Sequence, residues 1–195
     1  YGNRFHSKYR IKKLMKKIKL DMPVVISQLK DHTKIKADVL ALINSEVSGE
    51  QIVEGDTLDI SNCDYKMSDK DRSWTKLIQP YILENMTHVC KDLGYDAFKI
   101  YNIWFQQYNE GSTHGWHIHT QCQWSNVYYL DMPEGSPQTQ LINPWNQTEV
   151  ITMDVKEGDV LTFPSFVIHR APVNENTTTK TIVSFNSDVE LNYGK

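Results

Sequence analysis

The 195-residue chain has no long apolar run, and none of its apolar stretches approaches the roughly 20 residues that a membrane-spanning helix needs. It also has few cysteines. Cys63, Cys90 and Cys122 are odd in number and scattered, which argues against a disulfide framework and favours a reducing compartment. A net charge of −3 gives no general reason to expect nucleic-acid binding. We therefore expect a cytoplasmic protein that engages neither a membrane nor nucleic acid.

Positive charge is concentrated near one end of the chain. Residues 4–19 (RFHSKYRIKKLMKKIK) are strongly basic and lack the uninterrupted apolar core of a signal peptide. We interpret residues 1–19 as a basic tail or a leader, with native translation starting at Met15. The remaining residues, 20–195, have the length and composition of a single globular domain.

Two segments before residue 95 have apolar residues at helical spacing. Residues 33–47 (TKIKADVLALINSEV) repeat apolar side chains every three or four positions, with Thr33 as the expected N-cap. Residues 74–93 do the same and are closed by Gly94, while Pro80 indicates either a kink or a later start of the helix. We therefore expect the helical part of the domain in residues 20–94.

The sequence after Gly94 is rich in aromatic and β-branched residues and is broken by turn signals. The segments with strand character include AFKIYNIWFQQY (97–108), WHIH (116–119), SNVYYL (125–130), QLINP (140–144), GDVLTF (158–163) and KTIVSFN (180–186). Two helices followed by about seven short strands predict an α+β, mainly β fold whose core is a sandwich or a barrel.

Three of the seven histidines, His114, His117 and His119, lie close together in the chain. Side chains alternate between the faces of a strand, so His117 and His119 should point the same way, where two imidazoles can bind one metal ion. For this pair alone, surface or hydrogen-bonded core histidines are an equally good interpretation. His169 changes the balance, because two close ligands and a distant third are typical of a metal site with open coordination positions.

The order and spacing of WHIH, SNVYYL, GDVLTFPSFVIHRAPV (158–173) and KTIVSFN resemble those of the Fe(II)- and 2-oxoglutarate-dependent oxygenases. Within that superfamily the chain is most similar to a small prolyl-hydroxylase-like branch with bacterial and phage members. The similarity covers roughly residues 98–188. It implies a double-stranded β-helix, the cupin-like jelly roll, over residues 95–190, with the N-terminal helices packed on one sheet.

The resemblance implies that His117, His119 and His169 are metal ligands and form the catalytic centre. His119 stands where relatives more often have Asp or Glu. Three neutral imidazoles would leave a bound Fe(II) its full double positive charge, whereas a carboxylate would neutralise part of it. His114 is the spare histidine, expected on a turn as a group beside the ligands, as a substrate group, or as a replacement for His119.

The resemblance also implies a binding site for the co-substrate. Lys180 matches the basic residue that pairs with the far carboxylate of 2-oxoglutarate, although relatives often have Arg there. Arg170 is the competing anchor. Tyr129 matches a tyrosine whose hydroxyl assists the same carboxylate, with plain core packing as the alternative. Ser184 and Asn186 share the strand parity of Lys180 and are expected to line the pocket.

The function implied by the resemblance is hydroxylation of a small-molecule or peptidyl substrate, with Fe(II), 2-oxoglutarate and ascorbate, and with release of succinate and CO2. Two alternatives stay open: a three-His cupin dioxygenase that acts without 2-oxoglutarate, and a non-catalytic jelly roll that binds a metal or ligand. A homodimer is also left open. We expect Trp104, Trp116 and Trp124 to wall the cavity, and the loop 48–70 and the turn 133–140 to gate it.

Overall fold

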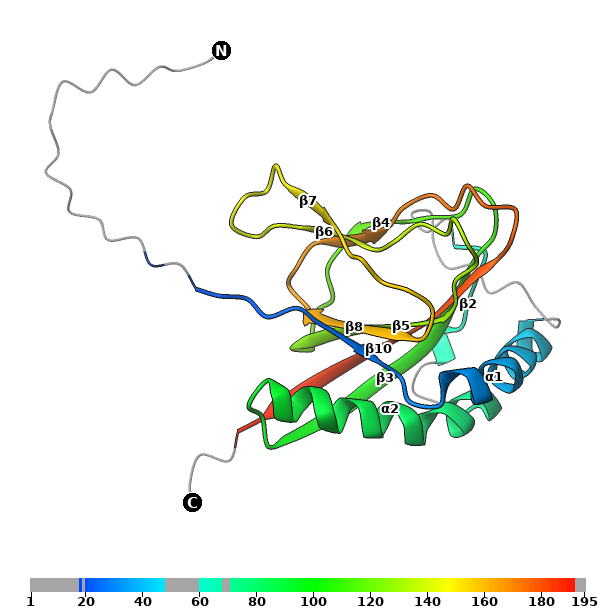
Figure 1. The fold of residues 1–195 in the computed structure, drawn as a ribbon, viewed down its shortest axis with the longest axis horizontal. Coiled ribbons are helices and arrows are strands. Elements are labelled where there is room, and N and C mark those ends of the chain that lie inside the picture. The colour runs from blue at the N-terminus through cyan, green and yellow to red at the C-terminus, as the bar shows by residue number, and fades with distance from the viewer. Residues whose placement is uncertain (1–17, 19, 48–59, 68–70, 192–195) are drawn as a thin grey trace, which may run out of the picture.

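The fold consists of two antiparallel β-sheets and two helices (Figure 1), in a computed structural model that describes residues 18, 20–47, 60–67 and 71–191. The expected basic tail lies outside these residues, apart from residue 18, and so does most of the expected gate at 48–70. None of the helices in the described ranges is long and apolar enough to cross a membrane.

The larger sheet has six strands in the order β1-β8-β5-β10-β3-β2. The bounds of these strands are β1 (Val25–Gln28), β8 (Asp159–Pro164), β5 (Trp124–Asp131), β10 (Lys180–Glu190), β3 (Ala97–Tyr108) and β2 (Asn62–Cys63). The smaller sheet has the order β4-β9-β6-β7. Its bounds are β4 (His114–His117), β9 (His169–Ala171), β6 (Gln140–Ile142) and β7 (Val150–Thr152).

The two helices, α1 (His32–Val47) and α2 (Ser73–Asp92), cover one face of the larger sheet, and the smaller sheet lies over the other face (Figure 1). A short 3-10 helix, η1 (Tyr65–Met67), precedes α2. The core therefore has two parts. One lies between the helices and the larger sheet, and the other lies between the two sheets. The predicted α+β, mainly β architecture, with helices packed on one sheet, is confirmed.

Strand β5 has apolar or aromatic residues at four consecutive positions, from Val127 to Leu130. Tyr128 and Leu130 pack under the helices, whereas Val127 and Tyr129 point into the space between the sheets. Because side chains alternate along a strand, a central strand that is covered on both faces needs apolar residues at consecutive positions. This strand carries residues into the inter-sheet space, where the candidate site lies.

The helix boundaries differ slightly from the predicted ones. Helix α1 begins at His32, so Thr33 lies inside the helix and the expected N-cap is wrong. Helix α2 begins at Ser73 and contains Pro80, so the alternative of a later start is also wrong. Pro80 is exposed, and the carbonyl group that loses its helical hydrogen bond can bind water there. Gly94 has a φ of 80°, as expected for a glycine that ends a helix.

The strand expected at residues 116–119 is displaced. Strand β4 ends at His117, and His119 lies in the following loop, where its backbone N–H donates to the carbonyl oxygen of Ser165 at 3.1 Å. The alternation argument that placed His117 and His119 on one strand face is therefore wrong in its geometry. The structure also adds β1 and β2 to the part of the chain expected to be helical.

Candidate metal centre

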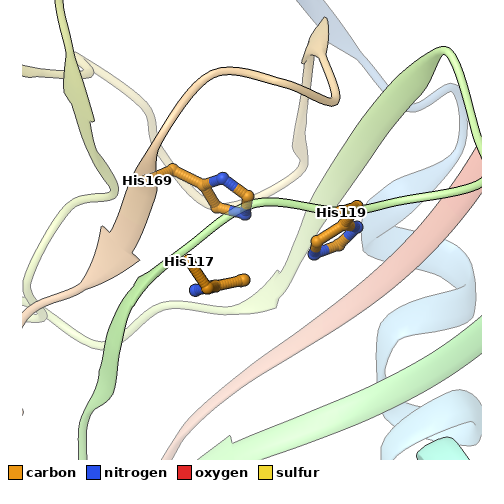
Figure 2. Close-up of side chains that lie close together, drawn as sticks. All are labelled: His117, His119 and His169. Atoms are coloured by element: carbon orange, nitrogen blue, oxygen red, sulfur yellow. The ribbon is translucent and has the colours of Figure 1, made fainter.

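Three histidine side chains converge between the sheets (Figure 2). Strands β4 and β9 are paired so that His117 lies directly opposite His169. Their ring centroids are 4.1 Å apart, and the ring of His119 lies 5.3 Å from the first and 5.1 Å from the second. One ring nitrogen from each of the three histidines lies within 4.8 Å of the other two. This grouping could hold one metal ion.

Hydrogen bonds fix the orientation of all three rings. Nδ1 of His117 and Nδ1 of His169 each donate to the backbone carbonyl oxygen two residues earlier, at 2.7 and 2.9 Å. Nδ1 of His119 donates to Oδ1 of Asn186 at 2.7 Å. Because these oxygens can only accept, each Nδ1 carries the proton and each Nε2 keeps a free lone pair. Metal-binding histidines usually have this second hydrogen bond, so the arrangement suits metal binding.

Burial keeps the imidazoles of the site neutral. It lowers the pKa of His169 to about 2 and that of His117 to about 4, and it also lowers the pKa of His119. The neighbouring imidazoles lower the pKa values of His117 and His169 further. Burial lowers the pKa of His114 to about 3, with His117 as the next cause. Neutral imidazoles are ligands for iron, zinc, copper and nickel rather than for magnesium or calcium.

We expect the metal-free protein to lose thermal stability as the pH falls from about 7 to about 5. In the unfolded chain the imidazoles have an ordinary pKa near 6.5, whereas in the native state His114, His117 and His169 stay neutral well below it. Below about pH 6.5 the unfolded state therefore binds more protons. Each group then removes up to about 1.4 kcal/mol of stability per pH unit.

Calorimetric melting of the chelated protein across this pH range measures the effect. The variant His169→Phe should show a shallower decline of the melting temperature with pH. The matched control is His88→Phe, because His88 is exposed on α2 and its replacement should leave the decline unchanged. A melting temperature that is constant between pH 7 and 5 would contradict the proposed neutral burial of these rings.

Two cavities adjoin the three histidines. The smaller has a volume of about 20 Å3, and the larger, which is partly lined by Trp104, has about 250 Å3. Gln106, His114 and His119 line both cavities. The smaller cavity is completed by side chains from both sheets and the loops between them: Tyr108, His117, Val127, Thr139, His169, Arg170, Ala171, Ile182 and Ser184.

Of the three tryptophans expected to wall the cavity, only Trp104 does so. Trp124 packs in the core under the helices. Trp116 is 39% exposed and stacks against the guanidinium of Arg170, whose carbon lies 4.5 Å from the ring centroid. Nε of Arg170 also donates to Oε1 of Gln140 at 2.8 Å. The side chain of Arg170 is therefore held in place by two residues of the smaller sheet, Gln140 and Trp116.

Lys180 is buried between two aromatic rings and is only 1% exposed. Its Nζ donates to the carbonyl oxygen of Pro137 at 2.5 Å and lies 5.5 Å from the ring centroid of Tyr129 and 5.9 Å from that of Tyr108. Within the described ranges no carboxylate forms an ion pair with it. Burial lowers its pKa to about 8. A buried amino group without a carboxylate partner favours an anionic ligand, because the ligand's negative charge would offset the cost of burying the positive charge.

The hydroxyl groups of Tyr129 and Ser184 both hydrogen-bond to residues that line the smaller cavity. The hydroxyl of Tyr129 donates to Oγ1 of Thr139 at 2.6 Å, and Thr139 lines the cavity. Ser184 also lines it, as expected from the sequence, and donates to Oε1 of Gln106 at 3.0 Å. Asn186 lies instead beside the larger cavity.

Sequence reasoning missed several lining residues, among them Gln106, Tyr108 and Thr139. Gln106 and Tyr108 share the strand parity of Trp104, so the alternation along β3 could have identified both. Thr139 lies just before β6, where no periodicity indicates which way a side chain points.

Comparisons with known proteins agree with the resemblance seen in the sequence. Residues 102–153 match the sequence model of a family described as "Putative 2OG-Fe(II) oxygenase". No curated protein matches the chain.

Several solved structures share the fold. A prolyl-4-hydroxylase from Pseudomonas putida is 13% identical, with a TM-score of 0.59 over 85% of this chain and 92% of its own. A Trichoplax adhaerens prolyl hydroxylase, solved with a peptide fragment of a hypoxia inducible factor, is 18% identical, with a TM-score of 0.62 over 84% and 82%. A viral collagen prolyl hydroxylase from Paramecium Bursaria Chlorella virus-1, solved with 2-oxoglutarate, is 14% identical, with a TM-score of 0.56 over 84% and 94%.

At these identities the solved structures establish the fold, and the family match adds a sequence segment that contains His117 and His119. The predicted jelly roll is therefore confirmed. The chain has the jelly-roll fold of the 2-oxoglutarate/Fe(II) oxygenases and, over residues 102–153, their sequence pattern.

Proposed function

We propose that this protein is an Fe(II)- and 2-oxoglutarate-dependent oxygenase that hydroxylates a small-molecule or peptidyl substrate. The observation that carries the proposal is the convergence of three imidazoles beside a small cavity, with Nζ of the buried Lys180 5.9 Å from the ring centroid of Tyr108, which lines that cavity. The sequence match and the fold support the same conclusion.

His117, His119 and His169 would hold the metal through Nε2. Their donor set fits Fe(II), because imidazole is a ligand for iron and the three second hydrogen bonds already fix the rings. When bound, Fe(II) and 2-oxoglutarate supply the oxidation, in which O2 converts 2-oxoglutarate to succinate and CO2 and places one oxygen atom in a C–H bond of the substrate. Ascorbate would keep the iron in its ferrous form.

Lys180 would bind the far carboxylate of 2-oxoglutarate by a charge-assisted hydrogen bond. The pairing removes the energetic cost of a buried, uncompensated ammonium group. The ring centroid of Tyr129 lies 5.5 Å from the same Nζ. The hydrogen bond from its hydroxyl to Thr139 would keep both side chains in place around the far carboxylate. Arg170 is less suited to this role, because Gln140 and Trp116 already hold its guanidinium.

The three-His ligand set also favours a second candidate, a cupin dioxygenase that oxidises a chelating substrate without 2-oxoglutarate. The two candidates differ in what they require of Lys180. A direct dioxygenase has no need for a buried cation near the metal, so Lys180 favours the first candidate.

Succinate formation tests the proposal. Protein loaded with Fe(II) and supplied with ascorbate, 2-oxoglutarate and O2 should release succinate slowly even without a substrate, and His169→Ala should not. Oxygen consumption that needs no 2-oxoglutarate would favour the direct dioxygenase. Metal binding without either reaction would favour a binding protein.

We expect the affinity for 2-oxoglutarate to fall as the pH rises from about 7 to about 9. The ligand needs Lys180 as an ammonium, and burial places the pKa of the ligand-free group at about 8. Above that pH each further unit should weaken binding up to about tenfold. Calorimetric titration of the Zn(II)-loaded protein measures this. In Lys180→Arg the dependence should disappear, since guanidinium keeps its charge. An affinity of the parent protein that does not change with pH would exclude Lys180 as the anchor.

A further inference from the structure

His114 lies against the three converging histidines without joining them. Its ring stacks on that of His117, with centroids 3.7 Å apart and an angle of 16° between the planes. It is not part of the group whose nitrogens lie within 4.8 Å of one another. His114 also lines both cavities, so it borders the space beside the metal centre and the larger cavity next to it.

A short hydrogen-bond relay fixes the protonation of His114. Oγ of Ser184 donates to Oε1 of Gln106, so the amide nitrogen Nε2 of Gln106 is the end that faces His114, at 3.3 Å from Nδ1. An amide nitrogen can only donate, so Nδ1 of His114 accepts. In a neutral imidazole the proton then resides on Nε2. This tautomer is opposite to that of the three converging histidines, whose Nε2 atoms keep free lone pairs.

This tautomer makes His114 a hydrogen-bond donor, whereas the three neighbouring histidines can act as metal ligands. It offers an N–H donor, and a protonated nitrogen cannot bind a metal. Among the residues that the structure describes, none accepts a hydrogen bond from this Nε2. A ligand oxygen is a suitable acceptor, because His114 is partly buried and a donor left unpaired away from water costs free energy.

The larger cavity suits an uncharged ligand. Its volume of about 250 Å3 corresponds to roughly eight water-sized volumes. Its walls combine aliphatic, aromatic and neutral polar side chains, with the ring of Tyr65 edge-on to Trp104 at 5.0 Å. The described lining residues include no lysine, arginine, aspartate or glutamate: Ile60, Cys63, Tyr65, Trp104, Gln106, His114, Ile118, His119, Thr120 and Asn186. An ion would lose water there without meeting an opposite charge.

We propose that this cavity binds an uncharged group of the substrate, whose carbonyl or hydroxyl oxygen accepts a hydrogen bond from Nε2–H of His114. His114 is then a substrate-binding residue that orients the group beside the metal centre. The inference rests on the proposed function only in identifying the bound group as part of the substrate.

Three probes of one shape and size test the preference for an uncharged group: benzamide, benzoate and benzamidinium. The protein is first saturated with Zn(II) and 2-oxoglutarate, so that benzoate cannot occupy the metal or the lysine site. Binding is followed by the NMR shift of the Trp104 indole N–H, which Trp104→Phe identifies. Benzamide should bind at least about tenfold more tightly than either ion. Equal or tighter binding of benzoate or benzamidinium would overturn the inference.

Variants of His114 and its relay test the donor. His114→Phe keeps an aromatic ring against His117 but removes the N–H, and should weaken benzamide binding about three- to tenfold. Gln106→Met removes the group that fixes the tautomer and should weaken binding in the same direction. His88→Phe, an exposed position on α2, is the matched control and should leave binding unchanged. Unchanged benzamide affinity in both cavity variants would exclude the hydrogen bond.

These measurements need neither O2 nor turnover, so they separate the two proposals. A protein that binds benzamide as described but forms no succinate would contradict the oxygenase function and support the cavity's preference. A protein that forms succinate but prefers a charged probe would overturn the inference and leave the function supported.

Discussion

Replacing His169 by alanine should abolish detectable Fe(II) binding and, with it, succinate formation. His169 is 5% exposed, and it provides one of three nitrogens that lie within 4.8 Å of one another. Loss of a partner that only orients a ligand typically lowers metal affinity 10- to 100-fold, so loss of the ligand itself should lower it by more than about 100-fold. Anaerobic titration with Fe(II), and with Co(II) as a coloured substitute, measures the affinity.

The companion variants identify the complete ligand set. His117→Ala and His119→Ala should have effects as large as that of His169→Ala, whereas His114→Phe should retain the metal. The matched control is His88→Ala, on the exposed face of α2. If His114→Phe loses the metal while His119→Ala keeps it, then His114 is the third ligand and the tautomer assigned to it is wrong.

The second large effect is expected at Lys180. Lys180→Met should weaken 2-oxoglutarate binding about 10- to 100-fold, because a hydrogen bond to a charged group contributes about 1.5–3 kcal/mol. Metal affinity should stay unchanged. The ligand-free variant should also melt at a higher temperature, since methionine replaces a buried ammonium that no carboxylate in the described ranges compensates.

The control for this prediction is Arg170→Met. Arg170 is the other cation near the site, but Gln140 and Trp116 hold its side chain. Its replacement should change 2-oxoglutarate affinity little, and Lys180→Arg should be milder than Lys180→Met because the charge is kept. If Arg170→Met weakens binding and Lys180→Met does not, the anchor is Arg170.

Much of the fold could be predicted because its long strands have strong local patterns. The predicted segments 97–108 and 180–186 lie in β3 and β10, which pair over most of their length in the larger sheet. Strands β1, β2, β7 and β9 have four residues or fewer, too short for an alternating pattern to be recognised. Strands β1, β2 and β9 pair with strands far away in the chain, which local sequence does not encode, whereas β7 pairs with the nearby β6.

The candidate site was predictable in its residues and less so in its geometry. Spacing and resemblance brought His117, His119 and His169 together, but the position of His119 depends on a loop whose backbone is held by Ser165. Strand parity groups Trp124 with Tyr128 without saying which sheet face meets the helices, and in the structure both pack under them. The relay through Gln106 joins side chains from the three strands β3, β4 and β10, so it could be found only in three dimensions.

The most direct test of the central claim is a crystal structure grown without oxygen in the presence of Fe(II) and 2-oxoglutarate. The account predicts one metal ion bound by Nε2 of His117, His119 and His169 at about 2.0–2.2 Å, as in other imidazole–metal bonds. It also predicts the far carboxylate of 2-oxoglutarate in contact with Nζ of Lys180. A metal ion bound elsewhere, or a dicarboxylate that pairs with Arg170 and leaves Lys180 without a carboxylate partner, would contradict it.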